Sequence, residues 1–303
     1  MNVLVTGSTG LVGSSLCTSL ERHHHRVIHM VRRTPVSDNQ AFWNPARGEL
    51  NAGAFDGVDA VVHLAGESLT GGRWTGEKKR RILDSRVLGT RLLAESIARL
   101  PSPPKVLVST SAVGYYGDRG DELLDEDSGP GSGFLADVCQ QWERATEPAA
   151  RAGIRVVILR FGIVLSASGG ALDRMLPVFR MGFGGKIGNG RQHISWIALD
   201  DLTGVIEYAI GNESLSGPVN AVSPDPVTNH TFSKKLGKVL RRPVWLMLPG
   251  FAARIVFGEM ADALLLASSR VLPSRLAGTA FQFRFPSLEH ALGHTFPPKD
   301  PFQ

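Results

Sequence analysis

The stretch Val3-Leu4-Val5-Thr6-Gly7-Ser8-Thr9-Gly10-Leu11-Val12-Gly13 decides the fold of this chain. Its first four residues form a short apolar run typical of a buried strand, and helical periodicity follows from Leu11 to about Arg22. Gly7 and Gly10 allow a tight turn against a pyrophosphate, and Gly13 allows the helix to pack closely on the sheet. The helix N-terminus then offers N–H groups and a positive dipole end to phosphates. The sequence therefore predicts a dinucleotide site at Gly7, Ser8, Thr9, Gly10, Leu11, Val12 and Gly13.

The end of the second predicted strand, residues 27–31, indicates which nucleotide is preferred. About 20 residues after the glycines, an NAD-binding protein usually places an acidic residue on the ribose 2′-hydroxyl. This chain has Arg32 and Arg33 there, and guanidinium groups donate hydrogen bonds and match a 2′-phosphate in charge and shape. We therefore expect NADP(H) as the cofactor. A solvated basic turn is the alternative, above all for Arg33.

Alternating strands and helices continue outward from this stretch. We expect further strands over residues 59–66, 106–109 and 156–160, and helices over 77–100 and 134–152. Continuous apolar strands separated by helices predict an α/β fold, a Rossmann-type doubly wound parallel sheet. A strand at 194–197, a helix at 200–210 that its aspartates would cap, and a strand at 219–222 complete the expected pattern.

After residue 160 the alternation loosens into a glycine-rich stretch and then a mostly helical region. We expect an NADP-binding domain over residues 1–165, to which residues 195–222 return. The remaining residues, 166–194 and 223–303, would form a smaller, mostly helical C-terminal substrate domain.

Composition limits the class of protein. The 303 residues carry 33 Lys and Arg against 28 Asp and Glu, and 43% are hydrophobic, which excludes a disordered or collagen-like chain. The two cysteines lie far apart in sequence, so a reduced, cytoplasmic protein is expected. Neither a signal peptide nor a run of about 18 apolar residues is evident, and basic residues are scattered. We expect no nucleic-acid or membrane partner; a homodimer is left open.

Two polar clusters are possible metal sites by composition. His23, His24 and His25 fall where the first helix should turn into the second strand, and a polar turn with His near a helix C-terminus is the simpler interpretation. Six carboxylates lie within residues 118–127, where a solvated surface loop is the simpler interpretation. We therefore expect no metal site.

Several motifs together resemble an extended short-chain dehydrogenase/reductase. They are the three glycines, then His63-Leu64-Ala65-Gly66, Ser109-Thr110-Ser111-Ala112 and Arg160-Phe161-Gly162-Ile163-Val164. Further features resemble an atypical "epimerase family protein" subfamily that is nucleoside-diphosphate-sugar epimerase-like. They are Gly66-Glu67-Ser68, Arg73-Trp74, Ser85-Arg86, residues 112–117, Trp142-Glu143 and Gly188-x-Gly190-Arg191-Gln192. The resemblance covers essentially the full chain.

The resemblance implies roles for individual residues. His63, Leu64, Ala65 and Gly66 would line the adenine–ribose side of the cofactor, and Arg86 would contact NADP. Ser109 belongs to the same cofactor set, and Ile163 would pack near the nicotinamide. Ser111 would hydrogen-bond a substrate oxygen, and Arg191 would hold an anionic substrate group.

One departure from the family concerns catalysis. Catalytic members carry Tyr-x-x-x-Lys, in which the Tyr exchanges a proton with substrate and the Lys lowers its pKa. The matching positions here are Phe134 and Val138, which can supply neither proton nor charge. Tyr115 and Tyr116 lie four and five residues after Ser111, so one of them is a candidate proton donor. The alternative for both is an aromatic ring packed over the cleft.

These observations support an NADP(H)-binding oxidoreductase-like protein that acts on an unknown small molecule. A non-catalytic NADPH-binding regulatory protein is the alternative from another class. A nucleotide-sugar epimerase is a third alternative, which the missing Tyr and Lys disfavour.

Overall fold

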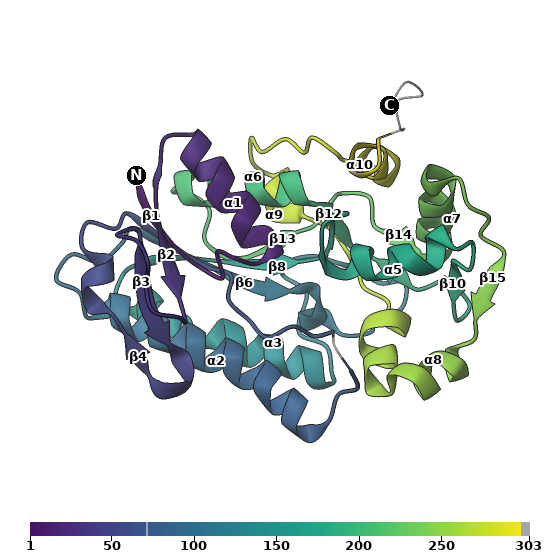
Figure 1. The fold of residues 1–303 in the computed structure, drawn as a ribbon, viewed down its shortest axis with the longest axis horizontal. Coiled ribbons are helices and arrows are strands. Elements are labelled where there is room, and N and C mark those ends of the chain that lie inside the picture. Colours follow the sequence, from purple (N-terminus) through teal and green to yellow (C-terminus); the bar gives the residue numbers. More distant parts are fainter. Residues whose placement is uncertain (71, 298–303) are drawn as a thin grey trace. The chain divides into compact units, whose positions relative to one another are not determined.

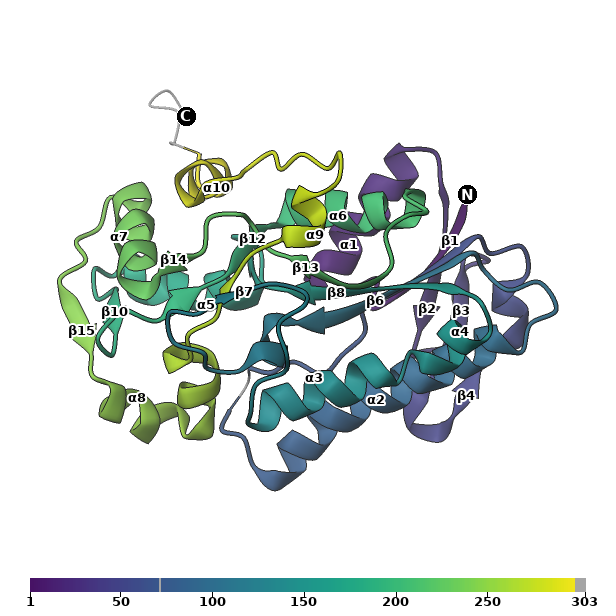
Figure 2. The same cartoon turned by 180° about the vertical axis from the view of Figure 1, so that it is seen from behind.

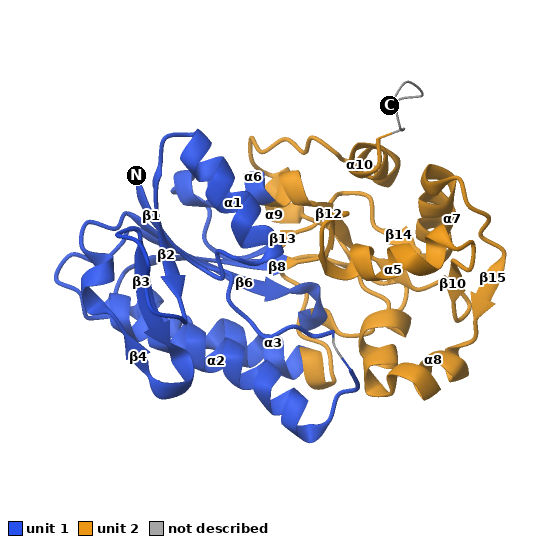
Figure 3. Ribbon diagram, in the orientation of Figure 1, with its two compact units in different colours: residues 1–115, 136–160, 203–219 blue, residues 116–135, 161–202, 220–303 orange. Residues whose placement is uncertain are grey.

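The computed structural model describes residues 1–70 and 72–297 and divides into two compact units, shown in two colours in Figure 3. Unit 1 comprises residues 1–115, 136–160 and 203–219. Unit 2 comprises residues 116–135, 161–202 and the described part of 220–303. Our domain boundaries, drawn at 165/166, 194/195 and 222/223, stay a prediction.

The main sheet is built around β1 (Asn2–Thr6), as Figure 1 shows. Its strand order is β13-β8-β6-β5-β1-β2-β3-β4. The bounds are β2 Arg26–Val31, β3 Gln40–Asn44, β4 Glu49–Leu50, β5 Ala60–His63, β6 Val106–Ala112, β8 Arg155–Phe161 and β13 Gly217–Ala221. Pairs from β6 through β3 are parallel, and β4 joins β3 antiparallel. The chain runs outward from β1 through β2 and β3, then resumes on the other side with β5. The switch point of a doubly wound sheet therefore lies between β1 and β5.

Helices cover both faces of this sheet. They are α1 (Leu11–Arg22), α2 (Gly76–Ala98), α3 (Phe134–Arg144), α4 (Glu147–Arg151) and α6 (Leu199–Gly211). Figures 1 and 2 show α2 and α3 together on one face and α1 on the other. The Ser15 hydroxyl on α1 is 3.3 Å from that of Thr203 on α6, so these two helices are neighbours. The predicted α/β, Rossmann-type fold is confirmed.

The core of unit 1 explains why these elements form. Fully buried apolar residues from adjacent strands, such as Leu4, Val61 and Leu107, pack against Leu93 and Ile97 of α2. The last two lie four residues apart, on one face of the helix. None of the helices described within residues 1–70 and 72–297 has the length and hydropathy needed to cross a bilayer.

Several elements differ from the sequence prediction. The helix expected at 134–152 ends at Arg144 and resumes at Glu147, where Pro148 occupies the first turn, a position that proline tolerates. The strand expected at 194–197 is two strands, β11 (His193–Ile194) and β12 (Trp196–Ala198). Strands β3 and β4 were not predicted, because the 40–50 region is short and only half apolar.

Unit 2 combines short strands with helices around its own core. Its further elements are β7 Leu123–Leu124, β9 Ile163–Leu165, α5 Gly170–Arg180, β10 Gly185–Ile187, β14 Val227–Thr228, α7 Asn229–Leu240, β15 Leu246–Leu248, α8 Gly250–Phe257, a π-helix Ala261–Leu266, β16 Arg270–Val271, α9 Ser274–Ala277 and α10 Leu288–Thr295. Helix α5 lies in the stretch that we expected to be loop. Its buried Leu172, Leu176 and Phe179 pack in one cluster with Trp196 and Phe232.

The aspartates at the start of α6 do not serve as the predicted caps. Both oxygens of the Asp201 carboxylate instead accept from backbone N–H groups, those of Arg284 at 2.7 Å and Phe285 at 3.0 Å. The Asp200 carboxylate lies 2.8 Å from Nε2 of His294. Both side chains therefore anchor the C-terminal segment of unit 2.

Buried polar groups tie the acidic stretch 118–127 to the rest of unit 2. The Tyr116 hydroxyl lies 2.8 Å from both the Asp125 carbonyl and the Asn220 side-chain oxygen, and Tyr116 is fully buried. The Glu126 carboxylate accepts from the backbone N–H groups of Asn220 and Arg275. Burial raises the pKa of Glu126, because the charged form is desolvated. The stretch is therefore more than a solvated loop, since part of it is structural.

We expect Tyr116→Phe to lower the free energy of unfolding by about 1–3 kcal/mol, because it leaves two buried acceptors without their donor. Urea unfolding followed by circular dichroism measures this change. Tyr208→Phe is the matched control, since the Tyr208 hydroxyl accepts a hydrogen bond from the side chain of Asn212, the residue directly after the same helix. Equal stability of Tyr116→Phe and wild type would contradict the structural role.

Candidate nucleotide site

The glycine turn after β1 is fixed by close backbone contacts. Gly7 has a φ of +67°, and a Cβ placed on it would lie 2.8 Å from the carbonyl carbon and oxygen of Leu64. A Cβ on Gly13 would lie 2.2 Å from the Gly7 carbonyl oxygen. Gly10 is less crowded, because its Cβ would meet only that same oxygen, at 3.3 Å. Gly7 and Gly13 are thus required by the fold, whereas the space next to Gly10 is open.

The first turn of α1 is suited to an anion. Its N-cap is Gly10, which has no side chain to cap the helix, and no acidic residue lies in the first turn. The N–H groups of such a turn and the positive end of the helix dipole attract phosphate oxygens. Ser8 is buried and Thr9 is exposed beside it. The predicted glycine-turn residues therefore form one surface at the carboxyl end of β1.

A hydrogen-bonded pair at the ends of β1 and β5 holds this turn in place. The Thr6 hydroxyl lies 2.7 Å from Nδ1 of His63 and accepts from the N–H groups of Leu64 and Ala65. Since its lone pairs take these two donors, the hydroxyl proton points to Nδ1, and His63 carries its own proton on Nε2. The Nε2 atom is buried without a hydrogen-bond partner among the described residues. Thr6 was absent from the predicted site because a threonine within a strand carries no motif.

The side chain of His63 does not line a cofactor surface, as we had expected it to. The residue is fully buried, its ring packs edge-on against Trp43, and its Cε1 lies close to Gly89 of α2. Burial lowers the pKa of His63 to about 4. The prediction is corrected to a structural role, because the apolar environment keeps the imidazole neutral.

Leu64, Ala65 and Gly66 follow β5; the backbone of Leu64 and Ala65 faces the glycine turn, and Gly66 lies next to the Arg86 guanidinium. Arg86 of α2 supports them from behind: its Nη1 donates to the Glu67 carbonyl at 3.0 Å and to the Ile82 carbonyl at 3.2 Å. Its guanidinium also lies 5.0 Å from the Trp142 ring. Burial lowers the pKa of Arg86. In this structure Arg86 therefore positions the loop after β5.

Charged side chains gather at the ends of β2 and β5. Arg32 and Arg33 are exposed directly after β2. Lys78 Nζ lies 2.7 Å from Glu67 Oε1, and this hydrogen bond is the main cause of a lowered pKa at Glu67, with Arg32 contributing through its charge. Lys78 was missed from sequence, because it lies in a run of four basic residues that reads as a solvated helix surface.

A buried network at the end of β6 holds Ser111. Its hydroxyl donates to Glu143 Oε1 at 2.7 Å, and Arg160 donates to both oxygens of the same carboxylate, at 2.9 and 2.8 Å. The Arg160 guanidinium also lies 3.5 Å from the centre of the Tyr115 ring. Ser111 and Arg160 are 1% and 3% exposed. The Ser111 hydroxyl is therefore bonded toward α3 in this structure, and Glu143 is the partner that sequence reasoning missed.

The remaining predicted residues are distributed over both units. Ser109 is buried in unit 1, and its hydroxyl has no partner within the described part of the chain. Ile163 on β9 and the exposed Arg191 belong to unit 2. Phe134 begins α3 and is half-buried, whereas Val138 one turn later is 2% exposed.

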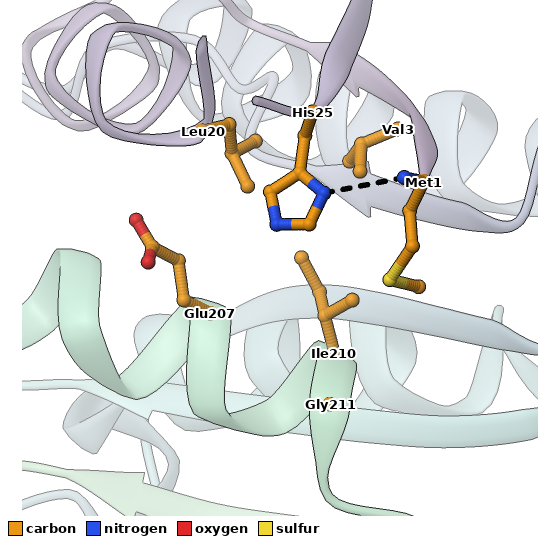
Figure 4. Close-up of a pocket in the computed structure, with 7 residues that line it drawn as sticks. All are labelled: Met1, Val3, Leu20, His25, Glu207, Ile210 and Gly211. Atoms are coloured by element: carbon orange, nitrogen blue, oxygen red, sulfur yellow. Dashed lines mark hydrogen bonds between the residues drawn. The ribbon is translucent and has the colours of Figure 1, made fainter. Parts of the chain in front are cut away.

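A small hollow of about 160 Å³ lies in unit 1 next to the amino-terminal end of β1 (Figure 4). Apolar side chains, among them Leu20 and Ile210, surround His25, whose Nδ1 is 3.3 Å from the Met1 amino group. Desolvation, and then the charge of that amino group, lowers the pKa of His25. Since the hollow adjoins the start of β1, it is separate from the glycine turn at the other end of that strand.

Comparison with known proteins identifies the family. The model of the NAD-dependent epimerase/dehydratase family matches residues 3–221. This chain belongs to that family. A second model, for a domain of unknown function (DUF1731), matches residues 248–295. The predicted resemblance is thereby confirmed.

Individual relatives match nearly the whole chain. It is 44% identical over 292 residues to epimerase family protein Mb2239 of Mycobacterium bovis, covering 96% of each protein. It is 36% identical to epimerase family protein SDR39U1 of Homo sapiens, covering 96% of this chain and 98% of the human protein. A crystal structure of human SDR39U1 (isoform2) with NADPH superimposes with a TM-score of 0.89 at 35% identity, covering 97% of this chain and 99% of the other.

We expect the buried His63 to make this family member less stable at acidic pH. Above pH 6.5 His63 is neutral in both states, so its contribution to stability is complete. As the pH falls from 6.5 toward about 4, only the unfolded chain takes up the proton, and stability drops by about 1.4 kcal/mol per pH unit.

Urea unfolding between pH 7 and pH 4.5 tests this expectation. His63→Gln should flatten the pH dependence relative to wild type, whereas the exposed turn residue His24, changed to Asn, should leave it unaltered. Parallel profiles for wild type and His63→Gln would show that His63 is not the titrating group.

Proposed function

We propose that this chain binds NADP(H) and acts as an oxidoreductase-like protein on an unidentified small molecule. The observation that carries the proposal is the exposed pair Arg32 and Arg33 after β2, beside a helix N-terminus that has no side-chain cap. Two guanidinium groups favour a 2′-phosphate over a free ribose hydroxyl. The similarity to human SDR39U1, crystallised with NADPH, supports the same cofactor.

The residues of unit 1 fit a dinucleotide. The turn Gly7–Gly13 would receive the pyrophosphate, Arg32 and Arg33 the 2′-phosphate, and the backbone of Leu64–Gly66 the adenine–ribose side. The nicotinamide, when bound, supplies or accepts a hydride. Ser109 offers a buried hydroxyl without a partner in the described chain, which is available to a polar group nearby.

Tyr115 is the proton donor that we propose. Its neighbour Tyr116 is fully buried and its hydroxyl is held by Asp125 and Asn220, so a substrate could reach it only after those bonds break. Tyr115 is half-buried, and Arg160 holds its ring from one side. Ser111 could orient a substrate oxygen only by giving up its bond to Glu143. In unit 2, Arg191 remains a proposed contact for an anionic substrate group.

NADPH binding without turnover is a second candidate function. It is favoured by Phe134 and Val138 in place of the Tyr and Lys, and by the commitment of Ser111 to Glu143. A chain with this arrangement would bind NADPH in order to sense its level or to bind another protein. A nucleotide-sugar epimerase has the least support, because it requires the acid–base group that is missing.

Calorimetry with NADPH and NADH tests the cofactor. We expect tighter binding of NADPH, and Arg32→Asp should weaken NADPH by about tenfold or more while favouring NADH, because a carboxylate repels the phosphate and accepts from a hydroxyl. Arg47→Asp, an exposed charge change elsewhere in unit 1, should have no effect.

Gly10→Val supplies the loss-of-site control for the same experiment. Its Cβ meets only one atom, at 3.3 Å, so the protein should stay folded while the branched side chain fills the pyrophosphate position. Equal affinities of wild type for NADPH and NADH would refute the cofactor assignment. Full NADPH affinity in folded Gly10→Val would remove the glycine turn from the site.

Turnover of NADPH with a panel of carbonyl metabolites separates the two candidate functions. If the protein is an enzyme, Tyr115→Phe should lower kcat by about 10²-fold or more with NADPH affinity unchanged. The double variant Phe134→Tyr with Val138→Lys restores the family pair. The single variant Phe134→Tyr is measured beside it, because Val138 is buried and a lysine at that position lowers the stability of the protein. Turnover gained only on restoring the pair would indicate that wild type binds NADPH without catalysis.

A further inference from the structure

The exposed apolar side chains of this protein are concentrated in two short stretches of unit 2. Residues 177–187 contain the end of α5 and β10, and residues 241–257 contain β15 and α8. They contribute nine of the thirteen large exposed hydrophobic residues among the described residues: Val178, Met181, Phe183, Trp245, Leu246, Met247, Phe251, Ile255 and Val256. We call these two stretches the apolar–basic face.

The two stretches are neighbours in space. Strand β10 pairs with β15 in parallel, with Gly185 opposite Leu246, and Gly182 lies close to Pro243. Both views of the ribbon show β15 at the outer edge of unit 2, joined to α7 at one end and to α8 at the other (Figures 1 and 2). Successive residues of a strand point to opposite sides, yet Leu246 and Met247 of β15 are both exposed, at 42% and 51%, and Trp245 directly before the strand is 80% exposed. The strand is therefore uncovered on both sides.

The charge of this face is of one sign. Its 28 residues include five basic ones, Arg180, Lys186, Arg241, Arg242 and Arg254, and no Asp or Glu. Arg254 pairs with Asp262 just outside the face, at 2.8 Å, and both side chains remain half exposed. Arg180, Arg241 and Arg242 are exposed beside the apolar side chains.

We propose that the apolar–basic face docks onto anionic phospholipid surfaces. An exposed Trp, a helix presenting Phe251 and Ile255 one turn apart, and adjacent arginines match what an interfacial segment needs: apolar groups for the acyl boundary and cations for the headgroups. A second copy of this chain is a poorer occupant, because symmetric pairing would bring two faces of the same positive sign together. Surface docking requires no membrane-spanning helix, which is the feature on which our expectation of no membrane partner rested.

Vesicle flotation tests the proposal with the full chain. We expect binding to vesicles of phosphatidylcholine containing about one-third phosphatidylserine at about 0.1 M NaCl, and much weaker binding to phosphatidylcholine alone or at about 0.5 M NaCl, where charges are screened. Arg241→Glu with Arg242→Glu should lower partitioning at least about tenfold, since each basic residue near an anionic surface matters by roughly fivefold. Arg99→Glu with Arg151→Glu is the matched control in unit 1 and should bind as wild type does.

Intrinsic fluorescence reports on the face directly. Trp245 is 80% exposed, whereas Trp43, Trp74, Trp142 and Trp196 are 9% exposed or less. Anionic vesicles should shift the emission to shorter wavelength, and Trp245→Phe should abolish that shift. Trp245→Ala with Phe251→Ala should weaken flotation, whereas Val36→Asp, at an exposed apolar residue outside the face, should not.

Unchanged circular dichroism and urea unfolding in every variant show that the fold is intact, so this test is independent of the proposed function. Absence of binding to anionic vesicles, or equal binding by the Arg241/Arg242 variant, would overturn the proposal. A concentration-dependent dimer that shields Trp245 without vesicles would also overturn it and assign the face to a second copy.

Discussion

The contact between the Gly7 turn and the backbone of Leu64–Ala65 is the constraint on which the arrangement of unit 1 depends. These two segments leave neighbouring parallel strands at the switch point, and the space between them excludes even one Cβ atom at residue 7. Thr6 maintains the contact, because its hydroxyl joins His63 and the N–H groups of Leu64 and Ala65. Gly13 extends it to α1. The surface offered to a nucleotide is thus formed mainly by backbone, and its shape follows from the packing beneath it.

The parts of the fold that sequence predicted well are those with local causes. Strand β1, its glycine turn and α1 are contiguous, and the apolar periodicity of α2 locates that helix within two residues. Side-chain roles that depend on distant partners were not predictable in this way. His63 lies within a predicted strand, but Trp43 and Gly89 enclose its ring. Asp201 lies in the first turn of a predicted helix but binds N–H groups 83 and 84 residues away. The partner of Ser111 lies 32 residues downstream on α3.

Ser111 belongs to a family motif, but in this chain its hydroxyl is bonded to the buried pair of Glu143 and Arg160. Removing either Glu143 or Arg160 would leave the other charge buried and unpaired, which would lower the stability of the protein. Ser111 adds a further hydrogen bond to this ion pair. Cys139 lies on the same helix, and burial raises the pKa of its thiol to about 12, so it stays protonated. The Ser111 hydroxyl at the end of β6 and the Glu143 carboxylate therefore already have hydrogen-bond partners within the protein. Any chemistry at Tyr115 would use a ring held from behind by Arg160, with a narrow choice of orientations.

The pairing of β7 with β16 links the two regions of the chain that different family models match. Leu123 and Leu124 lie in the region matched by the epimerase/dehydratase model, and their partners Arg270 and Val271 lie in the region matched by the DUF1731 model. Glu126 likewise depends on the Arg275 N–H. Recombination that transferred residues 3–221 alone would expose a carboxylate and an unpaired strand. The C-terminal region is thus not a detachable module, since the region matched by the first model relies on it for backbone partners.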